Sequence, residues 1–295
     1  MSWDWAKANA MDIAKFATDD ALKLFNLDVS SFDLRRENKI EELLEAIYDT
    51  LIHQAIQYDL EKTSSSETHQ RIRTPVEVLK TPKQGTCLDL ALLFCGLCLG
   101  CGLLPKLVIL ESHALVVVPI VKELFRENYK SNNYYQKEFL GKRKKDTQGN
   151  PRIEPDTYKN KDRLIFDLID ENIYRAIECT GFAYSKSMTS GSTELPPEFK
   201  RDEKGYLTFR QAKEVGQKQL DRLPFQYAVD IEVAHKEWGI TPETFDIPGG
   251  WEKAPMKEVI EQRITQASGD RAIAVGENVQ NSTFITGDSN TVQRG

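Results

Sequence analysis

The chain has 295 residues, of which 40% are hydrophobic and 28% are charged, and its net charge is −6. This composition is typical of an ordinary soluble protein, and the length allows one large domain or two modest ones with an ample core. The acidic balance argues against a dedicated nucleic-acid binder, which would normally be basic, so we expect no direct nucleic-acid contact.

The apolar runs and the cysteines exclude two further classes. The longest apolar run, Leu90–Leu104, is interrupted by Gly and Cys and is shorter than the roughly 20 residues of a membrane span. The first residues contain acids early and lack a long apolar core, so we expect neither a secretory signal nor a membrane partner. Five cysteines, four of them between positions 87 and 101, do not suit a disulfide framework, and we therefore expect a reducing cytoplasm.

The N-terminal part of the chain is predicted to be helical, with a first helical segment over residues 1–37. From Lys39 to Leu60, apolar residues recur mostly at three- and four-residue steps, which predicts an amphipathic helix with one buried face. The apolar positions of this face are Ile40, Leu43, Leu44, Ile47, Leu51, Ile52 and Ile56. Further on, Val76–Leu79 is predicted to be a short helix that leads into a turn.

The centre of the chain combines a cysteine, a helix and a histidine. The turn Gly85-Thr86-Cys87 opens an apolar segment that predicts a helix over Leu88–Gly100, and a β-rich run predicts a strand over Leu107–Val118 with His113 in its middle. A thiol at a helix N-terminus faces unpaired backbone N–H groups and the positive end of the helix dipole, which favour the thiolate. A nearby histidine can act as base and later as acid, so this layout suits thiol chemistry.

Residues 119–163 differ in kind from the segments around them. They contain twelve Lys or Arg against seven Asp or Glu, together with turn signals such as Gly149-Asn150-Pro151, which indicates an insertion on the surface. The run Lys142–Lys145 could be a nucleic-acid patch, but four charges in a polar loop are usually a solvated face. Strand-like sequence resumes at Leu164–Ile169 and at Ile173–Cys179.

The following segments predict one strand, two helices and one ambiguous region. Gly205–Phe209 is predicted to be a short strand and Arg210–Leu223 a helix. Phe225–Trp238 is ambiguous, because its first part alternates like a strand and its end suits a helix. A helical extension is expected over residues 239–266, with a helix at Trp251–Thr265.

The last thirty residues change character. Gly-Asp and Gly-Glu pairs separate short β pieces there, at Ala272–Val275, Phe284–Thr286 and Thr291–Val292 among others. Small strand-and-turn units of this kind need neighbours to bury their faces. We therefore expect residues 267–295 to be an interaction tail that connects to further chain or to a partner.

A Cys–His pair needs a third group that fixes the imidazole tautomer and stabilises the imidazolium. The candidate is Glu178, within Tyr174–Gly181. This segment lies one strand beyond the insertion, where an antiparallel neighbour of the histidine strand is expected. We therefore expect Glu178 to lie beside His113.

Three motifs follow one another in an order that resembles a known family. Gly85–Asp89 (Gly-Thr-Cys-Leu-Asp) opens an apolar helix, His113–Val116 (His-Ala-Leu-Val) lies in a strand, and Ile177–Gly181 (Ile-Glu-Cys-Thr-Gly) follows. With the lead-in Arg73–Leu79 and the link Gly102–Pro105, this order resembles the transglutaminase-like superfamily of papain-fold enzymes over about residues 40–185. The chain departs from the family in having Glu where Asp is usual, and in the long insertion before that acid.

The resemblance implies an α+β papain-like core over residues 38–238, in which a helix bearing the cysteine packs on an antiparallel sheet bearing the histidine and the acid. It implies a cysteine peptidase or related acyl-transferase with the triad Cys87, His113 and Glu178, which acts on a protein or peptide without a cofactor. The N–H of Cys87 and the side chain of Gln84 would donate hydrogen bonds to the oxyanion of the reaction intermediate. Asp89 is expected to support the first turn of the helix.

Three alternatives remain. The first is a non-catalytic interaction module that keeps the fold, and the second is a protein-glutamine acyl-transferase. The third is a zinc or iron–sulfur protein built on Cys95, Cys98, Cys101 and Cys179. The first three of these cysteines form C-x2-C-x2-C within a predicted helix, which leaves no loop to wrap a metal, so helix packing explains them better and we expect no metal.

The tail also carries an expectation about partners. It resembles linkers between an effector domain and the regulatory parts of large bacterial conflict or signalling proteins of the NTPase type. By that resemblance the chain would be an effector module in antiviral defence or signalling, held idle until a regulatory NTPase or sensor partner acts through residues 267–295.

Overall fold

The structure of the chain is a computed structural model. It describes residues 2–4, 8–32, 37–59, 69–120, 143–145, 151–153, 172–185, 189–190, 193–194, 198–255, 283–286 and 291–294.

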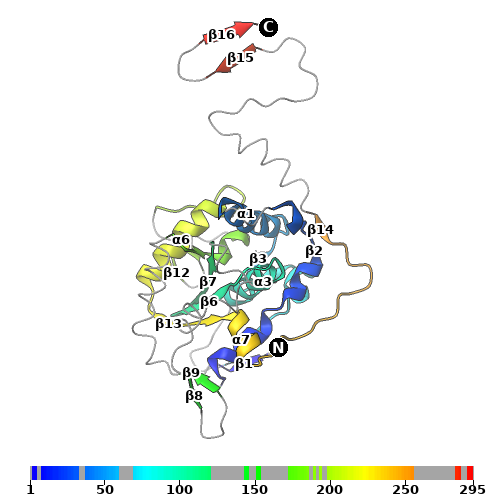
Figure 1. Cartoon of the computed structure of the whole chain (residues 1–295), viewed down its shortest axis with the longest axis vertical. Helices are drawn as coiled ribbons and strands as arrows, with labels where there is room; N and C mark the ends of the chain where they lie inside the picture. Colours follow the sequence, from blue (N-terminus) through cyan, green and yellow to red (C-terminus); the bar gives the residue numbers. More distant parts are fainter. Residues whose placement is uncertain are drawn as a thin grey trace.

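The centre of this mixed α+β fold is a four-stranded antiparallel sheet in the order β10-β7-β6-β13 (Figure 1). Its strands are β6 (Lys106–Leu110), β7 (His113–Pro119), β10 (Tyr174–Ile177) and β13 (Phe225–Asp230). β10 therefore lies beside β7 although the predicted insertion separates them in the sequence. This confirms the expected pairing of the segment before Glu178 with the histidine strand.

The single strand predicted over Leu107–Val118 is wrong, because this segment is a hairpin. β6 ends at Leu110 and β7 begins at His113, and these two residues are register partners. Glu111 and Ser112 are exposed and form the turn between them, with Ser112 at a positive φ of 61°. Two polar residues interrupt the apolar run and let the chain reverse. His113 therefore stands at the start of a strand and not in its middle.

The sheet is packed on both of its faces. On β7, Ala114 and Val116 belong to the main core, whereas Leu115 and Val117 belong to a second apolar cluster that includes helix α6 (Phe209–Arg222). Successive side chains of a strand point to opposite faces, so the two sets mark two packed layers. Burial of both layers explains why the strand has a continuous apolar sequence.

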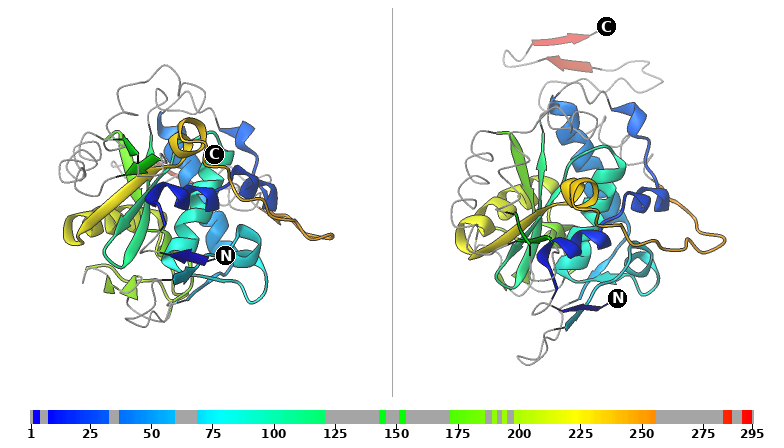
Figure 2. Two further views of the ribbon diagram at one scale, coloured as in Figure 1. Left: turned by 90° about the horizontal axis from the view of Figure 1, so that it is seen from below. Right: turned by 60° about the horizontal axis from the view of Figure 1, so that its bottom comes forward.

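Helix α3 (Cys87–Gly100) lies at the centre of the main core, in contact with β7 and with the N-terminal part of the chain (Figure 2). Every residue from Leu88 to Leu99 is buried, so the helix is covered on all sides. The helix predicted at this position is confirmed. Among the described residues, no helix has the length and hydropathy to cross a membrane.

Helix α1 (Glu37–His53) carries the predicted apolar face, and Ile40, Leu43 and Leu51 are fully buried. The helix ends before the predicted limit at Leu60. Ala55 adopts a positive φ of 51°, and the chain then enters the short strand β3 (Gln57–Tyr58). A non-glycine residue with this φ cannot continue a right-handed helix.

In the part of residues 1–37 that the structure describes, the helical segments are short 3-10 helices, joined by two short strands. The elements found before α1 are β1 (Ser2–Asp4), η1 (Ala10–Phe16), η2 (Asp19–Leu24), β2 (Phe25–Asn26) and η3 (Val29–Ser31), where η denotes a 3-10 helix. Asn9, Thr18 and Asp28 each accept a hydrogen bond from the backbone N–H two residues further on. These caps start a new short helix each time, which prevents one long α-helix.

The segments after β10 correct one prediction and resolve another. Gly205–Phe209 is not a strand, because Thr208 caps α6 and its Oγ1 accepts the N–H of Gln211 at 3.2 Å. The helix predicted over Arg210–Leu223 is confirmed as α6. The ambiguous segment Phe225–Trp238 contains both elements, β13 followed by α7 (Ile231–Glu237).

The helical extension predicted over residues 239–266 is described as far as residue 255, and that part contains no helix. The predicted helix Trp251–Thr265 is therefore wrong at its start, where β14 (Ala254–Pro255) instead pairs in parallel with β2. Pro255 lacks the N–H that a helix interior requires.

Only short pieces of the insertion and the tail are described. β8 (Arg143–Lys145) pairs with β9 (Pro151–Ile153), and β15 (Thr283–Thr286) pairs with β16 (Thr291–Arg294). The second pair confirms the last two β pieces predicted in the tail, while Leu164–Ile169 and Ala272–Val275 lie outside the described residues. The remaining elements are β4 (His69–Arg71), α2 (Pro75–Leu79), β5 (Gln84–Gly85), β11 (Thr189–Ser190) and β12 (Thr193–Glu194).

Gly96 of α3 allows η2 to approach the helix closely. A Cβ atom at this position would lie 2.5 Å from the carbonyl oxygen of Thr18 and 3.1 Å from Cβ of Ala21. We expect Gly96→Ala to lower the free energy of unfolding by about 1–3 kcal/mol, because the backbone of η2 must move. Urea denaturation measures this change. Gly249→Ala is the control, since no atom lies within 4 Å of the added Cβ, and equal stability of the two variants would contradict the expectation.

Candidate active site

Cys87 is the first residue of α3, and a capping box fixes the turn before it. Thr86 Oγ1 accepts the N–H of Asp89 at 3.3 Å, and Asp89 Oδ2 accepts the N–H of Thr86 at 3.0 Å. The N–H of Leu90 donates to the Thr86 carbonyl at 3.0 Å. The N–H groups of Cys87 and Leu88 take no part in this cap. The Cys87 side chain is half-buried, while Asp89 is buried and supports the first turn as predicted.

A second short strand holds the residues just before Cys87. β5 runs parallel to β3 with Tyr58 opposite Gly85, and the N–H of Asp59 donates to the Gly85 carbonyl at 3.0 Å. Gln84, the predicted oxyanion donor, is half-buried in β5. Burial raises the pKa of Tyr58, and Cys87 raises it further, so this phenol lies within electrostatic reach of the thiol.

His113 and Glu178 form a fully buried pair. Nε2 of His113 lies 2.7 Å from Oε2 of Glu178, and neither side chain is exposed. The pairing of Ile177 with Val116 brings the end of β10 to the start of β7. Oε1 of Glu178 accepts the N–H of Thr180 at 2.8 Å, which caps the 3-10 helix η7 (Cys179–Phe182). Both carboxylate oxygens are therefore engaged.

The pKa values of the pair separate strongly. Burial lowers the pKa of His113, but the negative charge of Glu178 and the nearby Cys87 thiol outweigh it and raise this pKa to about 10. Burial raises the pKa of Glu178, but the charge of His113 and the hydrogen bonds from His113 and Thr180 outweigh it and lower this pKa to about 2. An imidazolium beside a carboxylate is therefore the stable state over a wide range of pH.

The other ring nitrogen of His113 has an unusual environment. Nδ1 is buried and has no hydrogen-bond partner of ordinary geometry within the described ranges. An unpaired polar atom in a protein interior is costly and requires an explanation. Because the Cys87 thiol lies close enough to raise the pKa of this ring, the three predicted residues Cys87, His113 and Glu178 come together in the structure.

The sequence reasoning missed two residues beside this site. Tyr58 falls in a segment predicted to be helical, so its place beside β5 had no signal in the sequence. Arg201 donates hydrogen bonds to three carbonyl oxygens, those of Ala183 (2.9 Å), Gly205 (3.0 Å) and Thr180 (3.1 Å). Burial lowers the pKa of Arg201 and the charge of Glu178 raises it, so this guanidinium contributes to the field around the acid.

The other four cysteines are buried free thiols. Burial raises the pKa of each, to about 12 for Cys101 and well above the usual range for Cys98 and Cys179. Within the part of the chain that the structure describes, no group of His, Cys, Asp or Glu side chains is arranged to hold a metal ion. The packing role predicted for Cys95, Cys98 and Cys101 therefore agrees with their burial, and the described residues give no support to the metal-centre alternative.

Comparisons of the chain with protein-family models, with curated proteins and with solved structures found no match. The family resemblance of the sequence therefore stays a prediction.

The His113–Glu178 pair predicts a pH dependence of stability. The raised pKa of His113 adds stability that is complete below its ordinary value of 6.5 and is lost as the pH rises toward about 10. The lowered pKa of Glu178 adds stability that is complete above 4.5 and is lost as the pH falls toward about 2. The contribution of the pair is therefore largest between pH 4.5 and 6.5.

Glu178→Gln tests this dependence, because it keeps the shape of the side chain and removes its charge. At pH 5.5 we expect the variant to lose about 3 kcal/mol of unfolding free energy, and we expect the difference from the unmodified protein to shrink above pH 10. Chemical denaturation at several pH values measures both quantities. A difference that is constant across pH would show that the carboxylate charge does not stabilise the fold through His113.

Proposed function

We propose that the protein is a cysteine peptidase that uses Cys87 as nucleophile, His113 as base and acid, and Glu178 as the group that orients and charges the imidazole. The observation that carries this proposal is the fully buried His113 ring. Its Nε2 is engaged by Glu178, whereas its Nδ1 has no hydrogen bond of ordinary geometry among the described residues, and the half-buried Cys87 thiol lies close enough to raise the pKa of the ring.

The position of the thiol supports its role as nucleophile. The thiolate is the reactive form of cysteine, and a neighbouring imidazolium and a helix N-terminus both favour it. Cys87 has both neighbours, since it opens α3 and lies near a histidine whose pKa is raised. The other four cysteines are buried in apolar surroundings, where thiols are inert.

The reaction follows from this arrangement. Sγ of Cys87 attacks a substrate amide carbon, and the C–N bond breaks as His113 Nδ1–H gives its proton to the leaving amine. The acyl group is then held as a thioester on Cys87. Neutral His113 takes a proton from water, whose oxygen attacks the thioester carbon. The C–S bond breaks, the acid product leaves, and the thiolate and imidazolium return.

The oxyanion of each tetrahedral intermediate requires hydrogen-bond donors. The N–H of Cys87 is the first candidate, because the helix cap uses the N–H groups of Asp89 and Leu90 instead. Gln84 remains the second candidate, three residues before the nucleophile in β5. Removing one such donor typically lowers turnover by about 100- to 1,000-fold.

The arrangement of the elements supports a transglutaminase-like, papain-like fold. The buried helix α3 begins with Cys87. Two adjacent antiparallel strands carry the other two residues: β7 begins with His113, and β10 ends just before Glu178. Glu178 is longer than aspartate by one methylene group. It caps η7 through one oxygen and reaches His113 through the other, so the longer side chain is accommodated at this position.

We propose a cytoplasmic location and a regulated effector role as the setting of this activity. The free cysteines fit a reducing compartment, and the β15–β16 pair in the tail fits a segment that docks with a regulatory NTPase or sensor partner. A protein-glutamine acyl-transferase would use the same thioester, with an amine in place of water as the acceptor. A non-catalytic module would not need the buried imidazole pair.

Selective labelling of Cys87 tests the proposal. With iodoacetamide at a limiting dose and pH 7, we expect Cys87 to react at least about tenfold faster than the four buried cysteines, because only Cys87 is partly exposed and lies beside an imidazole. Peptide mass spectrometry measures the label at each cysteine. His113→Ala should remove most of this selectivity.

Turnover provides the second measurement. Cys87→Ala should abolish cleavage of a proteome-derived peptide library, and Cys101→Ala is the matched control that removes a thiol outside the site. Addition of a primary amine separates the two acyl-transfer outcomes, because a transferase would form the amide product. Equal labelling of all five cysteines, together with cleavage that survives Cys87→Ala, would rule out the triad.

A further inference from the structure

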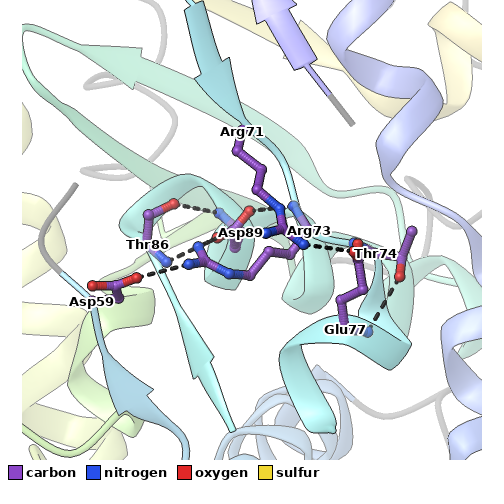
Figure 3. Close-up of polar contacts among 7 residues, drawn as sticks. All are labelled: Asp59, Arg71, Arg73, Thr74, Glu77, Thr86 and Asp89. Carbon is purple, nitrogen blue, oxygen red and sulfur yellow. Dashed lines mark hydrogen bonds and ion pairs between the residues drawn. The ribbon is translucent and has the colours of Figure 1, made fainter. Parts of the chain in front are cut away.

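The carboxylate of Asp89 does more than cap α3. Its Oδ1 accepts the backbone N–H of Arg73 at 2.8 Å, and its Oδ2 accepts both the N–H of Thr86 and Nη1 of Arg73, at 3.0 and 2.8 Å (Figure 3). The Asp89 side chain has no exposed surface. The two residues on either side of Cys87, Thr86 and Leu88, are buried as well. Asp89 therefore connects the start of α3 to Arg73, which lies 16 residues earlier in the chain.

Arg73 is the cation that balances this buried charge. Its Nη1 contacts Asp89 at 2.8 Å and its Nη2 contacts Asp59 at 2.7 Å, and its side chain is only 13% exposed. Burial lowers the pKa of Arg73, but the two carboxylates outweigh it and raise this pKa. The guanidinium therefore stays charged and bridges Asp59, which follows β3, to the helix that carries the nucleophile.

Arg73 itself is held in place by the residue that follows it. Thr74 caps α2 with a second capping box, in which Thr74 Oγ1 accepts the N–H of Glu77 at 3.2 Å and Glu77 Oε2 accepts the N–H of Thr74 at 2.8 Å. Pro75 is the first residue of that helix. This rigid turn follows Arg73 directly. The backbone N–H and Nη1 of Arg73 both donate to the carboxylate of Asp89.

We propose that Arg73 and Asp89 are positioning residues for the Cys87 nucleophile. The hydrogen bonds of Asp89 hold Cys87 at the start of α3, and the charge of Arg73 balances that of Asp89. This inference rests on the proposed function. Asp89 lies two residues after Cys87, so an unbalanced carboxylate there would oppose a thiolate on the first residue of the helix. Arg73 removes that penalty while the hydrogen bonds of Asp89 keep the turn rigid.

Other groups also act on the thiol, so the effect of Arg73 must be measured against them. Among the described residues, Tyr58 on β3, His113 on β7 and Cys179 in η7 interact electrostatically with Cys87. Asp89 lies in the first turn of the same helix, and Asp59 after β3 is the second carboxylate that contacts Arg73. None of these changes in a variant of Arg73. A shift in the pH profile of Cys87 in such a variant therefore reports the balance between Arg73 and its two carboxylates, and the Asp89 variant isolates the part that is due to Asp89.

The test measures the rate of Cys87 alkylation by iodoacetamide from pH 5 to 9 in the full chain. Arg73→Met leaves the charges of both Asp89 and Asp59 unbalanced, and we expect the midpoint of the profile to rise by about one pH unit. Asp89→Asn removes the negative charge and should lower the midpoint. The double variant should return it toward that of the unmodified protein, because both charges are then gone.

Opposite shifts in the two single variants distinguish charge balance from a merely structural role, which would slow alkylation in both without moving the midpoints apart. Arg71→Met is the matched control, since Arg71 lies two residues away and pairs with Glu77 at 2.9 Å on the surface (Figure 3). It should leave the profile unchanged. Near-ultraviolet circular dichroism verifies that each variant is folded, and if Arg73→Met is not, the downward shift in Asp89→Asn decides the question.

The outcomes separate the two proposals. Absence of selective Cys87 labelling in the unmodified protein overturns the proposed function, and with it the need for positioning. Selective labelling with midpoints that do not move in Arg73→Met or Asp89→Asn overturns the positioning role alone. Arg73→Lys adds a further criterion, because it keeps the charge but cannot bridge both carboxylates. It should keep the midpoint and lower the alkylation rate.

Discussion

The buried contact between His113 and Glu178 is the constraint around which the rest of the structure is arranged. An imidazole and a carboxylate with no exposed surface are tolerated in a protein interior only when they satisfy each other. Their contact requires β7 and β10 to be neighbours, and it requires the backbone turn at Thr180 that engages the second carboxylate oxygen. The other ring nitrogen, Nδ1, takes no part in this contact.

A second ion pair, between the partly buried Arg73 and the buried Asp89, sets the other half of the site. Arg73 and Asp89 fix the start of α3, as His113 and Glu178 fix the start of β7 and the end of β10. Cys87 lies between these two anchors and is itself only half-buried. The result is a half-buried thiol at a helix end, with hydrogen-bonded groups on both sides of it. The proposed acyl transfer would depend on such fixed positions.

The sequence predicted some of these elements because their signals are local. The apolar stretch after Cys87 is long enough to identify α3, and the spacing in Arg210–Leu223 identifies α6. Local patterns failed where a few polar residues decide the path of the chain. Glu111 and Ser112 turn one predicted strand into a hairpin, and the caps at Asn9, Thr18 and Asp28 start three separate 3-10 helices within the predicted helical segment.

Local sequence signals were enough to predict the residue types of the site and a helix that begins at Cys87, since helix caps and apolar periodicity act over a few neighbouring residues. The folded arrangement alone brings Arg73 to Asp89 and places Tyr58 and Arg201 near the site. It also leaves Nδ1 of His113 without a hydrogen bond of ordinary geometry among the described residues. These contacts join residues far apart in the chain. They form because buried charges must find partners, and the folded arrangement of strands and helices determines which partners are within reach.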